Sequence, residues 1–157
     1  MKKSLIALSL AAMLFATAGC GDGASQKDTT MEENDTLKCC KVSEEQIAGI
    51  RKPLDLYVGA AVAGDSHVAE PAFTSTATIS HIEDGELISL PIKALFDYYD
   101  ETGKQDATYE ITSCTVDGDV AVVSIDSKFG EAEFVDMFSL IKVGDDWKIV
   151  SKIFHAK

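Results

Sequence analysis

The stretch 134-FVDMFSLIKVGDDWKIVSKIFH-155 decides the fold of this chain, because its alternation predicts two long antiparallel strands. One face of the first strand holds an acid among apolar residues: Phe134, Asp136, Phe138 and Leu140. Its opposite face is mainly apolar: Val135, Met137, Ser139, Ile141 and Val143. The turn begins at Gly144, which can adopt the positive φ of a tight hairpin. The return strand is expected to place alternate residues on one face: Trp147, Ile149, Ser151, Ile153 and His155. Nearly every face is apolar, so we expect a central hairpin covered by other elements.

The elements before this hairpin are predicted to be helices first and strands afterwards. Ser43 and Gln46 form a capping box at the start of a helix that Gly64 ends. Pro53 is expected either to kink that helix or to mark its true first turn. We then expect a short helix at 65–69, strands at 74–82 and 87–90, and a helix opened by Pro91. The apolar stripe of that last helix is expected to consist of Ile92, Leu95, Phe96 and Tyr99. Four strands follow, at 107–117, 119–128, 131–143 and 147–156. This order predicts an α+β roll.

The closing hairpin resembles that of the nuclear-transport-factor-2-like (NTF2-like) superfamily, and most closely its putative lumazine-binding, SnoaL-like subgroup. In that subgroup an Asp–x–Phe/Tyr–x–Leu–x–Lys run leads through a Gly/Asp turn into Trp–Lys–Ile–Val–x–Lys, as it does here from Asp136 to Lys152. The resemblance implies a cone-shaped roll, in which a curved, mostly antiparallel sheet packs against three N-terminal helices. It also implies a pocket inside the cone. That fold hosts isomerases, hydrolases, dehydratases, cyclases and non-enzymatic binding proteins, so it names no activity.

The first residues predict export from the cytoplasm. Two lysines precede an apolar run from Leu5 to Ala18, which is a signal-peptide pattern too short for a transmembrane helix. Two processing sites compete: cleavage after Ala18, or a lipobox at 17–20 in which Cys20 is lipidated. The lipobox is favoured, although Thr17 stands where a large aliphatic residue is usual. We therefore expect a signal peptide at 1–19 and a protein anchored in a bacterial envelope by lipid on Cys20, with a soluble periplasmic or secreted form as the alternative.

Residues 20–41 are polar and poor in apolar side chains, which predicts a disordered tether before a single domain at 42–157. The adjacent Cys39 and Cys40 and the distant Cys114 are interpreted as unpaired or adventitiously oxidised cysteines. Their spacing predicts neither a metal site nor a cofactor site. The chain carries 14 basic and 26 acidic residues, a formal net charge of −12 at pH 7. This charge argues against nucleic acid as a partner.

Asp136 is the strongest candidate functional residue, because its strand face is otherwise apolar. Burial of a carboxyl group raises its pKa and can produce a general base or a hydrogen-bonding acid. The alternative is a structural role, with the carboxylate paired to Lys152 or to a tyrosine. Tyr57 is the second candidate, since it lies on the buried stripe of the first helix. The residues predicted to line a ligand pocket are Tyr57, Phe134, Asp136, Phe138 and Trp147.

Two functions follow from this pattern. The first is an envelope-anchored binding or accessory module for a small apolar or aromatic ligand. The second is a small lyase or isomerase that uses Asp136 and Tyr57 as catalytic residues on a hydrophobic substrate. Two or more ionisable groups converging on an open cavity would favour the enzyme, whereas a filled or single-acid cavity would favour the binder. The apolar outer face of the sheet further predicts a homodimer.

Overall fold

The computed structural model describes residues 42–157, so the predicted signal peptide, tether and Cys20 lie outside the described residues. The helical elements are α1 (Glu44–Ala63), two 3-10 turns, η1 (Ser66–Val68) and η2 (Glu70–Ala72), and α2 (Lys93–Thr102). The strands are β1 (Phe73–Glu83), β2 (Glu86–Pro91), β3 (Ala107–Asp117), β4 (Val120–Phe129), β5 (Ala132–Val143) and β6 (Asp146–Ala156). None of the described helices is long and apolar enough to cross a membrane.

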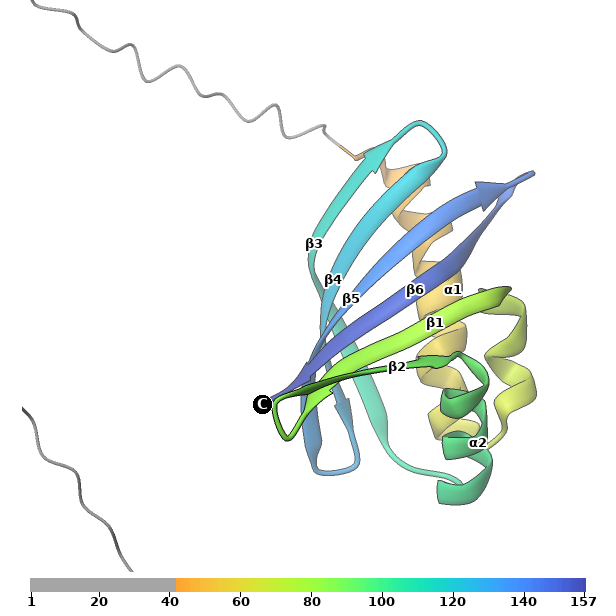
Figure 1. The fold of residues 1–157 in the computed structure, drawn as a ribbon. Coiled ribbons are helices and arrows are strands. Elements are labelled where there is room, and N and C mark those ends of the chain that lie inside the picture. The colour runs from red at the N-terminus through yellow and green to blue at the C-terminus, as the bar shows by residue number, and fades with distance from the viewer. Residues whose placement is uncertain (1–41) are drawn as a thin grey trace, which may run out of the picture. The chain divides into compact units, whose positions relative to one another are not determined.

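The six strands form one curved sheet in the order β2-β1-β6-β5-β4-β3 (Figure 1). Every neighbouring pair is antiparallel except β1 and β6, which run parallel. In Figure 1, α1 lies behind the sheet, and α2 covers the end of the same face near β1 and β2. The predicted α+β cone is confirmed, with the hairpin of β5 and β6 at the centre of the sheet.

Local sequence signals set the boundaries of α1. Gln46 and Ser43 cap each other reciprocally, with Gln46 N donating to Ser43 Oγ (3.1 Å) and Ser43 N to Gln46 Oε1 (2.9 Å). Gly64 ends the helix with φ of 61°, a left-handed conformation that favours glycine. Pro53 lies well inside α1, so the alternative that it marks the first turn is wrong.

The prediction that Pro91 opens a helix is also wrong. Pro91 is the last residue of β2 and pairs with Thr78, while α2 begins two residues later at Lys93. β2 is an edge strand of the sheet, where a residue without an N–H is tolerated. The apolar stripe predicted for this helix is nevertheless confirmed, since Ile92, Leu95 and Tyr99 are buried.

A β-bulge changes the predicted facing of the return strand β6. Ser139 pairs with Ser151, but the next residue, Leu140, pairs with Ile149, so Val150 has no partner on β5. Because side chains alternate along a strand, one extra residue shifts every later side chain to the opposite face. Trp147 and Ile149 are buried as predicted, whereas beyond the bulge Lys152 turns inward (4 % exposed) and Ile153 turns outward (50 % exposed). The prediction of one shared face from Trp147 to His155 is therefore wrong.

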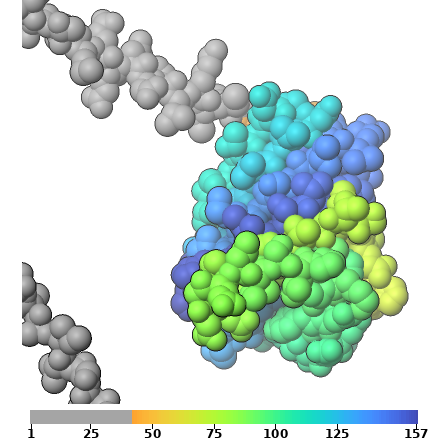
Figure 2. Space-filling model, in the orientation of Figure 1, coloured from red at the N-terminus to blue at the C-terminus, as the bar shows by residue number. Residues whose placement is uncertain are grey.

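The two faces of the sheet differ in what covers them. The inner face packs on α1 and α2, and its fully buried side chains include Phe138, Ile125 and Asp136. The outer face keeps large apolar side chains exposed on β4, β5 and β6, namely Val120, Val122, Met137, Ile141, Val143 and Ile153. Figure 2 shows the molecule from this side, with the β1–β2 hairpin in yellow-green across the lower part of the sheet. We call this set of six residues the outer apolar face.

Candidate functional site

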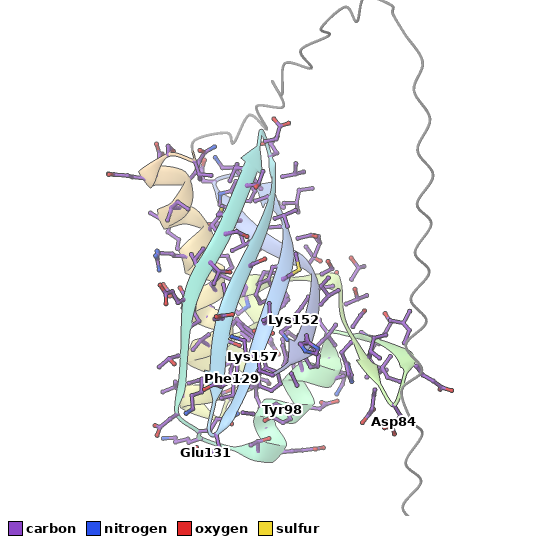
Figure 3. The ribbon with its side chains drawn as sticks, turned by 90° about the vertical axis from the view of Figure 1, so that its left-hand side faces the viewer. Asp84, Tyr98, Phe129, Glu131, Lys152 and Lys157 are labelled. Carbon is purple, nitrogen blue, oxygen red and sulfur yellow. The ribbon has the colours of Figure 1, made fainter. Side chains whose placement is uncertain are left out.

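An open cavity of about 280 Å³ lies between α2 and the inner face of the sheet. Its walls are mainly apolar and aromatic, and five ionisable side chains from α1, β1, α2 and β6 also contribute to them: Tyr57, Tyr98, Tyr99, Lys152 and His81. The remaining lining residues are Ile79, Leu90, Ala94, Leu95, Phe129, Phe134 and Phe154. Figure 3 labels three lining residues from three elements: Lys152 on β6, Phe129 on β4 and Tyr98 on α2. A concave, mostly apolar cavity with a few polar groups is the usual form of a small-molecule site.

Asp136 is the buried acid behind this cavity. Its Oδ2 accepts hydrogen bonds from the hydroxyls of Ser127 (2.7 Å) and Tyr57 (3.1 Å). Its Oδ1 lies 2.8 Å from Lys152 Nζ and forms an ion pair with it. Among the described residues, Oδ1 has no other polar partner. The carboxylate is wholly buried and is not one of the lining residues. It therefore holds the groups that face the cavity and does not itself face a ligand.

Tyr57 stands at the centre of an aromatic cluster on α1. Its ring packs edge-on against Phe138 (5.2 Å between centroids) and Phe129 (5.5 Å). Burial, and then the nearby Asp136 carboxylate, raise the pKa of Tyr57 well above its ordinary value. Its hydroxyl therefore stays protonated and donates a hydrogen bond to Asp136. Toward a ligand, the phenolic oxygen can act only as a hydrogen-bond acceptor. Burial also raises the pKa of Tyr99, whose hydroxyl donates to the backbone carbonyl of Tyr57 (2.9 Å).

Among residues 42–157, Lys152 alone places an ammonium on the cavity wall. Its Nζ lies 3.9 Å from the centroid of the Phe154 ring and 5.6 Å from that of Tyr57, so aromatic faces surround the charge. Burial lowers the pKa of Lys152 from its ordinary value, and the Asp136 carboxylate opposes that shift. An ammonium has three N–H donors and Asp136 engages one of them, which leaves donors for an oxygen atom in the cavity.

His81 closes the cavity on the β1 side. Its ring stacks on Phe154 at 4.6 Å between centroids and 26° between planes. Its Nδ1 is buried and has no hydrogen-bond partner among residues 42–157. His81 and Phe154 also line a second, more open hollow on the outer side, together with Met137 and Ile153. This stacked pair separates the cavity from that hollow.

The structure brings some of the predicted site residues together and separates others. Tyr57 and Phe134 line the cavity, and Asp136 touches Tyr57 from behind it. Phe138 is buried beneath the Tyr57 ring and does not line the cavity. Trp147 lies elsewhere, packed beside Gly49 of α1 and lining a separate hollow.

The cavity also contains residues that the sequence analysis did not select. Lys152 entered only as a possible structural partner of Asp136, because strict alternation placed its neighbours Ser151 and Ile153 inward. Tyr98 and Tyr99 lie on α2, where the sequence predicted an apolar stripe that included Tyr99. The contact of α2 with the sheet could not be read from that stripe. Among the described residues, no group of three or more His, Cys, Asp or Glu side chains could hold a metal ion.

Comparison with known proteins gives one family. The profile of a family described as putative lumazine-binding matches residues 45–155. NTF2-like proteins of unknown function from Shewanella baltica OS155 and Methylobacillus flagellatus KT have similar solved structures, each with 32 % sequence identity and a TM-score of 0.68. The first match covers 72 % of this chain and 94 % of the other, and the second covers 74 % and 96 %. The aldolase FrzH from a Cladobotryum species is 29 % identical over 103 residues, which are 64 % of this chain and 82 % of that enzyme.

Proposed function

Because the chain belongs to the putative lumazine-binding family of NTF2-like proteins, we propose that its domain binds one small, mainly apolar molecule in the inner cavity. An oxygen atom of that molecule faces Lys152. The observation that carries this proposal is an open apolar cavity with one buried ammonium on its wall. The volume of about 280 Å³ suits a compact ligand, since pockets for small molecules measure roughly 300–1,000 Å³.

Lumazine is the first probe, because the family description names it and because it carries carbonyl oxygens on a flat aromatic frame. The experiment is a titration of lumazine fluorescence with residues 42–157 and two variants. Ala94→Phe places a ring in the cavity from α2, whereas Ala48→Phe places the same ring on the exposed side of α1. We expect the wild type and Ala48→Phe to bind equally and Ala94→Phe to lose binding. Equal binding by all three would place the ligand outside this cavity.

A small lyase or isomerase acting on a carbonyl compound is the second candidate. One observation favours it: Tyr57, Lys152 and, behind them, Asp136 converge at the inner end of an open cavity. The similarity to an aldolase supports the same class. The discriminating experiment measures deuterium uptake from solvent at the carbon next to the carbonyl of a bound ketone. Uptake that Ala94→Phe abolishes would support catalysis, and uptake no faster than in buffer would leave the binding function alone.

We propose that lipid on Cys20 anchors the protein in the bacterial envelope, facing the periplasm or the cell surface. The support is the sequence Ala18–Gly19–Cys20 at the end of an apolar signal segment. Cys20→Ala should move the full-length protein from the membrane fraction to the soluble fraction. Equal solubility of the variant and the parent would favour cleavage after Ala18 instead.

We also propose that two copies pair through the outer apolar face. Met137 of β5 lies directly opposite Ile153 of β6, and Ile141 lies opposite Val120 of β4. Two adjacent pairs of exposed apolar side chains thus lie on one sheet surface, which is unusual for a surface that remains in water. A second copy of the same surface would cover them symmetrically.

A further inference from the structure

The position of Lys152 is more specific than a purely structural ion pair requires. Replacing a buried ion pair with apolar side chains is often neutral or stabilising, so stability alone is a weak reason for this arrangement. Lys152 also faces the cavity, whereas its partner Asp136 is hidden behind it. The Val150 bulge places that side chain there, since without the extra residue Lys152 would point to the outer face.

Three groups around Lys152 have the roles that imine chemistry needs. The Asp136 carboxylate, 2.8 Å from Nζ, can accept a proton from the ammonium. The Tyr57 and Ser127 hydroxyls hold that carboxylate through Oδ2 and leave Oδ1 for Lys152. The apolar walls exclude bulk water, and burial lowers the pKa of Lys152. Its neutral amine therefore forms more readily than that of a lysine on the surface.

We propose that Lys152 is a covalent attachment site, whose Nζ forms an imine with a small neutral aldehyde or ketone bound in the inner cavity. This inference rests on the proposed binding function and adds the ligand class and the mode of attachment. A neutral carbonyl compound is favoured over a carboxylate, because Asp136 already balances the charge of Lys152. An aromatic or branched alkyl substituent would pack against the rings of Phe129, Phe134 and Phe154.

The chemical step balances without any additional reactant. The Lys152 ammonium passes one proton to Asp136, and the freed lone pair on Nζ forms a bond to the carbonyl carbon. Nζ passes one proton to the carbonyl oxygen, takes back the proton held by Asp136, and passes a second proton to the same oxygen, which leaves as water when the C=N bond forms. One ammonium and one carbonyl thus give one iminium ion and one water molecule. The Asp136 carboxylate is regenerated beside the positive charge.

The test uses 1-phenylbutane-1,3-dione, which condenses with an unprotonated amine to a conjugated enaminone and water. Wild-type domain is incubated with the dione near neutral pH and digested, and peptide mass spectrometry locates the adduct. The exposed Lys93 in the same digest is the internal reference. We expect labelling of Lys152 to exceed that of Lys93 at least about tenfold, because the cavity holds the dione against Nζ.

Two variants and one control ligand complete the design. Lys152→Arg keeps a cation for Asp136 but forms no enaminone, so the near-ultraviolet absorbance of the adduct should disappear. Ala94→Phe should prevent labelling by filling the cavity. The corresponding 1-phenylbutane-1,3-diol, which has no carbonyl, is tested by saturation-transfer NMR for reversible binding.

The outcomes separate this inference from the proposed function. An adduct confined to Lys152 supports it, and localisation in the wild type does not depend on how well a variant folds. Binding of the dione or the diol in the cavity with no adduct overturns the inference and leaves the binding function standing. Equal labelling of Lys93 and Lys152 also overturns it. If neither compound binds and no adduct forms, the inference fails together with its premise.

Discussion

Replacing Asp136 with Asn tests the buried network most severely. The amide can still accept from Ser127 or Tyr57, so shape and part of the hydrogen bonding are kept. It cannot balance the ammonium of Lys152, which is only 4 % exposed. Removing one partner of a buried ion pair costs about 3–5 kcal/mol, a large part of the roughly 5–15 kcal/mol that stabilises a typical domain.

The assay is equilibrium unfolding in urea, monitored by Trp147 fluorescence and circular dichroism. Lys152→Met alone should cost a similar amount, because it leaves the Asp136 carboxylate unpaired. The double variant Asp136→Asn/Lys152→Met leaves no buried charge, so its cost should be at least about 2 kcal/mol less than the sum of the single costs. Additive costs would refute the pairing, as would a cost below about 1 kcal/mol for Asp136→Asn.

The cost of Asp136→Asn in unfolding free energy should also change with pH, in a direction that follows from the pKa of Lys152. Burial lowers the pKa of folded Lys152, so between its folded and unfolded pKa values unfolding takes up a proton and stability rises with pH. Asp136→Asn removes the carboxylate that opposes this lowering, so in the variant the window begins at a lower pH. The cost of the substitution should therefore be smaller at about pH 9 than at about pH 6. A cost that grows with pH would contradict this account.

Three further predictions concern other parts of the domain. Gly64→Ala should destabilise the domain by at least about 1 kcal/mol more than Gly144→Ala, as measured by unfolding in urea. Both glycines have positive φ, but only at Gly64 would an added Cβ collide with backbone atoms, those of Gly103 and Lys104. Ile141→Lys should shift residues 42–157 from dimer to monomer in sedimentation, and a wild type that is monomeric at every concentration would remove the dimer proposal. In an ultraviolet titration at about pH 10.5, no more than one of the four tyrosines should ionise in the native domain, whereas all four titrate together in urea. That result follows because burial raises the pKa of three of the tyrosines. The pKa of Tyr109 rises to about 12, and those of Tyr57 and Tyr99 rise well above their ordinary value.

Local signals in the sequence predicted most of the fold. The Ser43 capping box and the left-handed Gly64 depend on a few neighbouring residues, and the structure has both. The inward face of β5 was equally predictable, because every second residue of a strand lies on the same face. Asp136 therefore shares its face with Phe134 and Phe138, and the structure buries Asp136 and Phe138. Pro91 misled the prediction because proline suits both the first turn of a helix and the end of an edge strand.

The candidate site was less predictable, because it depends on pairing between strands. The Val150 bulge exists only in relation to β5, and nothing in the residues around it announces the change of face. Lys152 therefore escaped selection, although Asp136 and Tyr57, its neighbours in space, were found from periodicity. The cavity itself forms where α2 meets the sheet, so Tyr98 and Ala94 join it through tertiary packing alone.

The central claim is that the inner cavity, and not the outer apolar face, is the ligand site. Methyl-labelled NMR spectra of residues 42–157, recorded during titration with lumazine and then with 1-phenylbutane-1,3-dione, test it most directly. The account predicts shifts for the methyl groups of Ile79, Leu90 and Leu95, which line the cavity, while those of Val120 and Val143 stay unchanged. Shifts confined to Val120 and Val143, with the cavity methyl groups unmoved, would contradict it.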